Sequence, residues 1–521
     1  MPTMKKALAK IFAAPWYFAG FAVYPPLAII AYNINELHPA EGMRSLVLSL
    51  LAALILFGLL WLAFRSKQRA ALAVSFLLLL FYSYGHVLDL ASKKMDIPRL
   101  TEWMAGLWLV LAGAAIAWLV RRRTRVRKAA PVLNLVTLGL VITSTVQIIV
   151  QSSPRSASVA DDRAPVQILT IPADQTPPDI YYIIVDSYGR SDLLKRSFRI
   201  DNTEFIQRLE AMGFYVADCS QSNYGFTNFS LASTLDMDYM DKISERYLGG
   251  KMDLIWLPEL LQENEVRQNL EQLGYTIVSF ENDYFNLLWD DADVIYRKNP
   301  DRLSKERLFP DINGFEAMLI HESAALLLTD SLSIYATRLI PIENLPDSEH
   351  REIILYMFEK LKEIPLAVES PKFIYAHFVA PHFPIVFDSE GEPVTLAEDA
   401  DLETYIAGYR GEVIYLNKKI LEIVHEIIVV SATPPVIIIQ GDHGDDKSEA
   451  GNRMKILNAY YLPGIDKSKL YPIISPVNSF RLVFNEYFGG NYDLLPDKSF
   501  YSLQANPLDY TEIPNPCTIG E

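Results

Sequence analysis

The sequence contains very little cysteine. Its 521 residues include two, Cys219 and Cys517, so a disulfide network of the kind found in small secreted domains is excluded. It has no Cys-x-x-Cys spacing of the type that binds structural zinc. With about 300 residues between them, the two cysteines could form one bridge outside the cytoplasm or stay unpaired. The sequence leaves both possibilities open.

Basic residues are scarce in the second part of the chain. Residues 1–150 hold 16 Lys and Arg against 5 Asp and Glu, whereas residues 151–521 hold 31 against 58. The net charges of the two parts are therefore +11 and −27, in agreement with the total of −16. A nucleic-acid surface needs clustered basic residues, so nucleic acid is not expected as a partner. An acidic surface of this kind is typical of a well-solvated domain.

Long apolar runs, by contrast, fill the first 150 residues. They cover residues 16–33, 45–64, 70–90, 103–120 and 131–150. Each is close to the roughly 20 residues that a helix needs to cross a bilayer. The runs predict a transmembrane domain of five helices over residues 1–150. Because no small-residue cleavage site follows the first run, it is not interpreted as a signal peptide.

Basic residues mark one side of these predicted spans. Lys5, Lys6 and Lys10 precede the first run, and the segment RRRTRVRK (121–128) follows the fourth. Loops with an excess of Lys and Arg stay in the cytoplasm. We therefore expect an integral protein of the plasma (inner) membrane, with a cytoplasmic N-terminus and everything after the fifth run outside the cytoplasm.

Beyond a linker at 151–178, rich in Ser, Pro, Ala and Asp, the pattern changes to short apolar runs alternating with helical segments. The apolar runs include DIYYIIVD (179–186), GYTIVSF (274–280), KFIYAHFV (372–379) and PVIIIQ (435–440). Nearly continuous apolar strands between helices are typical of a sheet covered on both faces. Residues 179–521 are therefore predicted to form an α/β sandwich, the catalytic domain.

Three of these runs lead into reactive side chains. Asp186 ends the first, HFVAPHFP (377–384) continues the third, and Asp442 and His443 follow the last. In open α/β sheets, ligands bind at the carboxyl ends of the strands. A fourth segment, SNYGFTNFSLAST (222–234), offers hydroxyl groups at the start of a predicted helix.

Taken one at a time, these residues have ordinary interpretations. The hydroxyl groups could cap a helix, and His377, which alternates with apolar neighbours, could be a core histidine. Two carboxylates, an imidazole and a hydroxyl together would instead form a four-ligand site for a divalent metal. Asp445 and Asp446 follow directly; they could bind a second cation or an amine-bearing donor, or form a solvated acidic loop.

With these motifs, the sequence resembles the alkaline phosphatase superfamily, and within it the membrane-anchored sulfatase-like transferases, such as phosphoethanolamine transferases and lipoteichoic acid synthases. The resemblance covers the layout of five spans before an α/β domain and about five motifs from residue 179 onward. PDIYYIIVDSYGR, TNFS, HFVAPHFP and GDHG carry it. It implies a sulfatase-like fold, and it implies a site in which Thr227 is the nucleophile, His382 or else His377 contacts substrate, and Asp186, Thr227, Asp442 and His443 hold one zinc or manganese ion.

The activity that the resemblance implies is metal-dependent transfer of a phospholipid headgroup phosphate, phosphoethanolamine or phosphoglycerol. The acceptor would be an envelope glycan or lipid, and the reaction would pass through a phospho-threonine on Thr227. Two alternatives stay open: a hydrolase with water as acceptor, and a catalytically degenerate membrane scaffold. Sulfate-ester hydrolysis is disfavoured, because Cys219 is followed by Ser-Gln-Ser-Asn and not by the C/S-x-P-x-R context of true sulfatases.

Overall fold

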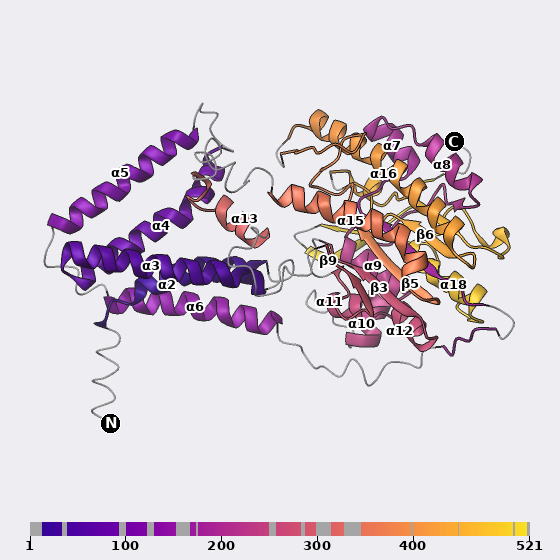
Figure 1. Ribbon diagram of the computed structural model, residues 1–521, viewed down its shortest axis with the longest axis horizontal. Coiled ribbons are helices and arrows are strands. Elements are labelled where there is room, and N and C mark those ends of the chain that lie inside the picture. Colours follow the sequence, from indigo (N-terminus) through magenta and orange to yellow (C-terminus); the bar gives the residue numbers. More distant parts are fainter. Residues whose placement is uncertain are drawn as a thin grey trace, which may run out of the picture. The chain divides into compact units, whose positions relative to one another are not determined.

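The structure, a computed structural model, places the chain in two compact units (Figure 1). The helical unit comprises Met1–Arg155 and Leu308–Pro346, and the sheet unit comprises Ser156–Arg307 and Asp347–Glu521. The residues that the structure describes are 13–33, 39–92, 100–121, 130–152, 167–172, 176–248, 257–282, 287–298, 314–327, 345–397, 400–445, 447–503 and 506–517.

Each of the five apolar runs forms a helix in the helical unit. These helices are α2 (Tyr17–Tyr32), α3 (Met43–Phe64), α4 (Lys67–Ser92), α5 (Leu100–Arg121) and α6 (Ala130–Ser152), with a 3-10 turn, η1 (Pro39–Gly42), before α3. By length and composition, four of them, α3 to α6, could cross a membrane. Helix α2 has 16 residues with Pro25 and Pro26 inside, so a fifth span stays a prediction.

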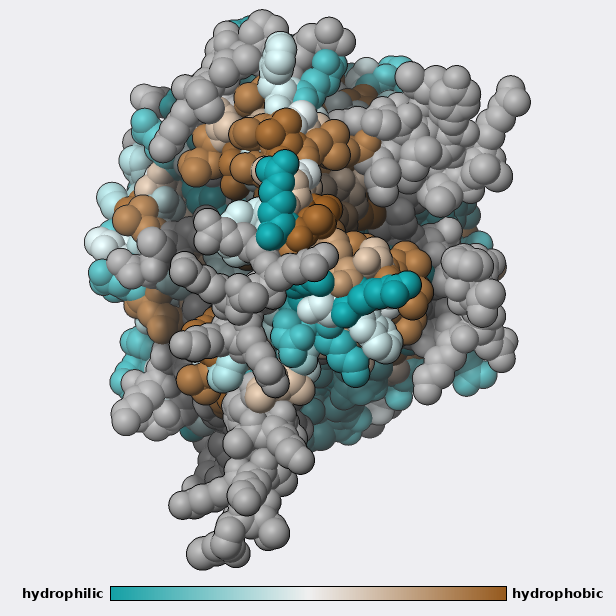
Figure 2. Space-filling view, turned by 90° about the vertical axis from the view of Figure 1, so that its left-hand side faces the viewer, coloured by the Kyte–Doolittle hydropathy of each residue, from teal (hydrophilic) through white to brown (hydrophobic). Residues whose placement is uncertain are grey.

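The described surface of these helices is rich in exposed apolar side chains. Leu59, Leu62 and Leu109 are 60%, 73% and 74% exposed. Figure 2 shows patches of hydrophobic residues on the face turned to the viewer, with hydrophilic residues among them. Soluble proteins rarely expose apolar surface on this scale, so lipid is the expected surroundings of α3 to α6.

One further helix of the helical unit comes from the second part of the sequence. Helix α13 (Gly314–His321) lies in the chain between β4 (Val294–Tyr296) and α15 (Leu345–Ala367). Its Phe315 is buried and packs in an apolar cluster with Ile30 of α2. The predicted domains, 1–150, 151–178 and 179–521, assign this segment to the third, whereas the structure places it in the helical unit.

The sheet unit contains a mixed sheet of seven described strands. Their order is β2-β7-β6-β1-β5-β3-β4. The bounds not yet given are β1 (Ile180–Val185), β2 (Tyr215–Val216), β3 (Thr276–Phe280), β5 (Lys372–Phe378), β6 (Val436–Gln440) and β7 (Asn458–Tyr461). Strand β7 is antiparallel to β6 and to β2, and the other described pairs are parallel. The strand β1 therefore lies at the centre, between β5 and β6.

Helices cover both faces of this sheet. Successive side chains of β1 alternate between two apolar cores: Tyr181, Ile183 and Val185 belong to one, and Ile180, Tyr182 and Ile184 to the other. The first core is closed by α7 (Ser191–Phe198), α8 (Thr203–Ala211), α15 and α16 (Leu402–Val430). The second is closed by α9 (Thr227–Leu235), α10 (Met240–Leu248), α11 (Leu257–Gln262), α12 (Glu265–Gln272) and α18 (Ser479–Tyr487). The predicted α/β sandwich is confirmed at this level, and burial on both faces explains the unbroken apolar strands.

The remaining elements are short. They are α17 (Ala450–Arg453), η6 (Lys467–Lys469), η7 (Pro476–Asn478) and an antiparallel hairpin of β8 (Ser499–Leu503) and β9 (Asn506–Ile513). The hairpin is held against the chain just before α9, because the Ser499 hydroxyl donates to the Ser222 carbonyl at 2.7 Å and the Phe500 N–H donates to the Asn223 carbonyl at 2.8 Å.

Cys219 and Cys517 form a disulfide, with 5.6 Å between their Cα atoms. The question that the sequence left open is thereby answered. The Asn515 side-chain amide also donates to the Cys219 carbonyl at 2.7 Å. The segment after the hairpin is therefore tied to the segment that leads into α9.

Candidate metal centre

Strand register places the two predicted carboxylates side by side. Ile184 of β1 lies opposite His377 of β5 on one side and Gln440 of β6 on the other. Asp186 and Asp442 each follow two residues later, at the same end of neighbouring parallel strands. Both residues therefore lie at the carboxyl ends of parallel strands, where open α/β sheets bind ligands.

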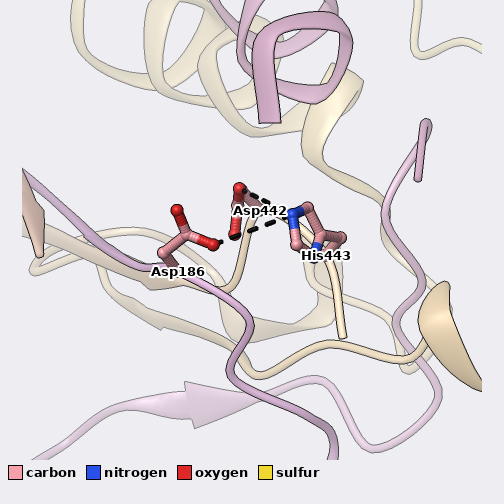
Figure 3. A group of neighbouring side chains, drawn as sticks. All are labelled: Asp186, Asp442 and His443. Atoms are coloured by element: carbon pink, nitrogen blue, oxygen red, sulfur yellow. Dashed lines mark ion pairs between the residues drawn. The ribbon is translucent and has the colours of Figure 1, made fainter. Parts of the chain in front are cut away.

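Asp186, Asp442 and His443 point toward one another at this strand end (Figure 3). The His443 Nε2 atom lies 3.7 Å from Asp186 Oδ1 and 3.5 Å from Asp442 Oδ2. One ligand atom from each of the three residues lies within 4.8 Å of the others, and all three side chains are buried. They form the one described group of at least three His, Cys, Asp or Glu side chains that could hold a metal ion.

Thr227 is the first residue of α9, and its Oγ1 lies 3.1 Å from His443 Nε2. Thus the structure brings all four predicted ligands together. Unlike the carboxylates, Thr227 is partly exposed. Its hydroxyl also lies at a helix N-terminus, where free N–H groups and the helix dipole favour a bound anion.

The orientation of His443 is fixed by its own neighbour. Its Nδ1 lies 2.7 Å from the Gly444 carbonyl, which can only accept, so Nδ1 carries the proton. Nε2 then has a lone pair that faces Thr227 and the two carboxylates. A histidine that donates from one nitrogen to a carbonyl and presents the other is the usual arrangement at metal sites.

Two glycines allow the GDHG turn to approach the rest of the site. A Cβ atom on Gly441 would lie 2.6 Å from the Tyr188 carbonyl oxygen, and one on Gly444 would lie 2.9 Å from the carbonyl oxygens of Asn452 and Lys455. None of these three backbone oxygens can move cheaply. The glycines on both sides of Asp442 and His443 are therefore required by close packing of the backbone.

Two serines that the sequence did not single out as site residues hold the Asp442 segment. The Ser187 N–H donates to Asp442 Oδ1 at 3.1 Å, and the Ser230 hydroxyl donates to the Asp442 carbonyl at 2.6 Å. Ser187 has a φ of 61°, a left-handed conformation that is unfavourable for a residue with a side chain and often found at functional sites. Ser230 could have been found from its spacing, because it lies one helical turn after Thr227.

The two histidines predicted to contact substrate differ in position. His377 is buried in β5, and its Nε2 lies 3.3 Å from Asp186 Oδ2. His382 is partly buried in the segment after β5, between two cis prolyl bonds, and its Nδ1 donates to the Phe383 carbonyl at 2.6 Å. His377 thus lies beside Asp186 of the candidate metal centre, and His382 is the more accessible of the two histidines.

Electrostatics at the strand end favour a bound cation. Burial raises the pKa of Asp442, and the charge of Asp186 raises it further. Burial also opposes ionisation of Asp186, but the neighbouring imidazoles of His382 and His377 hold its pKa below the usual range. Oδ2 of Asp442 is buried and accepts no hydrogen bond from any described group. A divalent cation would supply the missing partner, so the residues present fit one.

Asp445, directly after GDHG, is buried and not part of a solvated loop. The Tyr405 hydroxyl of α16 donates to its Oδ1, and the Ser448 hydroxyl donates to its Oδ2 at 3.0 Å. Asp445 thus fastens the GDHG turn to α16, a role that the sequence did not indicate. Asp446 lies outside the described residues.

Glu412 of α16 is another buried carboxyl group, close to the segment that follows His382. Its Oε1 accepts the Val386 N–H at 3.0 Å. Burial raises the pKa of Glu412 to about 8, although the Val386 N–H and the charge of His350 oppose the shift. The folded chain therefore keeps a proton that the unfolded chain releases near pH 4.5.

This proton makes the stability of the folded chain depend on pH. The contribution of this proton to the free energy of unfolding is fully present below about pH 4.5 and is lost as the pH rises through about 8. The free energy lost is roughly 1.4 kcal/mol for each unit by which the pKa differs between the folded and the unfolded chain. We expect Glu412→Gln to flatten the dependence of the urea midpoint between pH 5 and pH 8.5, and the exposed Glu392→Gln to leave it unchanged. An equal slope in wild type and Glu412→Gln would contradict this assignment.

No model of a known protein family matches the chain, and neither does any curated protein. Solved structures do match. One is the C-terminal periplasmic domain of EcEptC from Escherichia coli in complex with Zn, with 13% identity over 64% of this chain and 88% of that chain, and a TM-score of 0.42. Another is the integral membrane protein lipooligosaccharide phosphoethanolamine transferase A (EptA) from Neisseria meningitidis, with 16% identity over 92% of this chain and 95% of that chain, and a TM-score of 0.41.

A third match is the C-terminal periplasmic domain of phosphoethanolamine transferase EptC from Campylobacter jejuni, with 14% identity over 61% of this chain and 92% of that chain, and a TM-score of 0.35. Because identities and TM-scores this low say little about function, we argue function from the geometry of the site. The chain is nonetheless similar to phosphoethanolamine transferases, the group that its motifs resemble.

Proposed function

We propose that this chain is a membrane-bound enzyme that moves a phospholipid headgroup phosphate, phosphoethanolamine or phosphoglycerol, to a hydroxyl group of an envelope glycan or lipid. The contact that carries the proposal is the one between Thr227 Oγ1 and His443 Nε2 at 3.1 Å. It places the partly exposed Thr227 hydroxyl, at the N-terminus of α9, next to a histidine that also lies close to the buried carboxylates of Asp186 and Asp442. Hydroxyl nucleophiles of covalent phosphotransfer require such activation.

Asp186, Asp442, His443 and Thr227 would together hold one divalent cation, zinc or manganese. When bound, the cation would lower the pKa of the Thr227 hydroxyl and balance the negative charge of the phosphoryl oxygens. The protein's own contribution is to fix the ligands. The Gly444 carbonyl accepts a hydrogen bond from His443 and so keeps the proton on Nδ1. Ser187 and Ser230 hold the Asp442 segment in place through their own hydrogen bonds.

The reaction consists of two displacements at phosphorus. In the first, Thr227 Oγ1 forms a bond to phosphorus while the bond to the diacylglycerol oxygen breaks, and the proton lost by Thr227 ends on that oxygen. In the second, an acceptor hydroxyl forms the new bond, and Thr227 Oγ1 leaves and regains a proton. The N-terminus of α9 and His382 would contact the phosphoryl oxygens.

Features outside the site support a place at the membrane, with the site outside the cytoplasm. The helical unit supplies four membrane-length helices, which would keep the site near its lipid donor. The disulfide between Cys219 and Cys517 is of a kind that persists in oxidising compartments. The disulfide agrees with the orientation predicted from the basic loops.

The experiment is to incubate the full-length chain, in detergent and with zinc or manganese, with vesicles of phosphatidylethanolamine or of phosphatidylglycerol. Mass spectrometry of the peptide that contains Thr227 should then show a phosphoethanolamine or a phosphoglycerol adduct, together with released diacylglycerol. Release of the free headgroup phosphate without any acceptor would indicate a hydrolase. No adduct and no diacylglycerol with either lipid would indicate the scaffold.

A further inference from the structure

Helix α13 and the turn after it, residues 314–327, stand apart from the sheet elements that flank them in sequence. Strand β4 ends at residue 296 and α15 begins at residue 345, and both belong to the sheet unit. The segment between them belongs to the helical unit. The chain therefore passes between the two units three times, after residues 155, 307 and 346.

The apolar contact of this segment is made by Phe315. Its side chain is fully buried and packs with Ile30, and Leu27, Ile29, Ile148 and Leu319 surround the pair. Because Gly42 has no side chain, Ile30 and Phe315 can pack against each other beside it. A Cβ atom on Gly42 would lie 2.5 Å from Ile30 Cδ1 and 3.2 Å from Phe315 Cε2.

Polar contacts surround Phe315. The Arg44 guanidinium at the start of α3 donates to both carboxylate oxygens of Glu316, whose side chain is 10% exposed. His86 Nδ1 of α4 lies 2.6 Å from Glu322 Oε2. The Ala324 N–H donates to the Phe81 carbonyl at 2.8 Å. The segment thus reaches the C-terminal halves of α2 and α4 and the N-terminal end of α3, and Ile148 adds a contact with α6.

These parts of α2, α3 and α4 lie toward the side opposite the basic loops, which is the side predicted to be outside the cytoplasm. The Arg44–Glu316 pair gives the contact its specificity, because a guanidinium that donates to both oxygens of a carboxylate forms a strong and directional charge-assisted contact. An apolar anchor with polar contacts beside it is the usual composition of a specific protein interface.

We propose that residues 314–327 are a docking segment, which ties the sheet unit to the outer ends of α2, α3 and α4 independently of the linker at 151–178. The linker is one covalent connection. The docking segment is a second, noncovalent one that would keep the sheet unit at the membrane even when the linker is cut.

The test is to insert a protease site within residues 156–166 of the full-length chain and to cut it in isolated membranes. We expect the fragment that holds the sheet unit to stay with the membranes through a high-salt wash, and in detergent to copurify with a tag on the N-terminal fragment. Glu316→Lys and Phe315→Asp should each increase the released fraction at least tenfold. Lys418→Glu, on the exposed surface of α16, is the matched control and should release no more than wild type.

A charge exchange separates loss of docking from misfolding. Arg44→Glu alone should release the fragment, and Arg44→Glu combined with Glu316→Arg should restore retention. Release of the cut wild-type fragment would overturn the proposal, as would full retention of Glu316→Lys and Phe315→Asp. Retention in membranes without copurification in detergent would assign the attachment to lipid and would also overturn it. None of these readouts depends on catalysis.

Discussion

Thr227→Ala will reduce headgroup transfer by roughly a thousandfold or more, the usual scale for removal of a nucleophile. The alanine variant keeps Asp186, Asp442 and His443, so zinc or manganese should still bind, only more weakly. Transfer is measured by following labelled phosphatidylethanolamine or phosphatidylglycerol into diacylglycerol. Because the first displacement forms the bond to Thr227 Oγ1, diacylglycerol release and the covalent adduct should disappear together.

Thr227→Ser is the matched variant. It keeps the hydroxyl that faces His443 Nε2 and removes only a methyl group, so we expect it to retain measurable transfer and to form the adduct on the serine. A control at Thr203, an exposed residue at the start of α8 whose hydroxyl bonds Asp201, should behave as wild type when changed to alanine. Full activity in Thr227→Ala would rule out the covalent route.

Asp442→Asn will have opposite effects on metal binding and on the stability of the metal-free chain. The amide removes a charged ligand, so affinity for zinc or manganese should fall at least about 100-fold, since even groups that merely orient ligands are worth 10–100-fold. Without metal, however, the Asp442 carboxylate is buried beside Asp186, and both burial and that charge raise its pKa. A neutral side chain of the same shape removes this cost.

Both effects can be read from one experiment. Thermal unfolding of the chelator-treated full-length chain should begin at a higher temperature in Asp442→Asn than in wild type. Adding zinc should raise the midpoint of wild type but not that of the variant, because a ligand stabilises only the state that binds it. The exposed Asp493→Asn controls for a loss of surface charge. A metal-free variant less stable than wild type would show that Asp442 is a structural carboxylate.

Part of this site was predictable from sequence because it depends on local pattern. A buried parallel strand that ends in Asp186, and another that ends in Asp442 and His443, place their side chains at the same edge of a sheet. Thr227 was found through the resemblance of its motif, and the structure places it 3.1 Å from His443 Nε2.

What could not be predicted depends on contacts between distant residues. The partner of Asp445 is Tyr405, 40 residues away, and nothing near GDHG marks that tyrosine. The left-handed conformation of Ser187 leaves no trace in residue type, since glycine or asparagine is the usual signal. The docking of α13 depends on Arg44 and Glu316, 272 residues apart. Its short apolar pattern fits a sheet-unit helix equally well.

The disulfide has a consequence for how the chain is made. Cys219 is synthesised 298 residues before Cys517, which at 5–20 residues per second is an interval of about 15–60 s. During that interval the thiol has no intramolecular partner, so it cannot pair wrongly within these 521 residues. Closing the bond within these residues requires an oxidant and has one possible pairing. It would join the hairpin to the Thr227 segment only after the strands that carry Asp186 and Asp442 have been made.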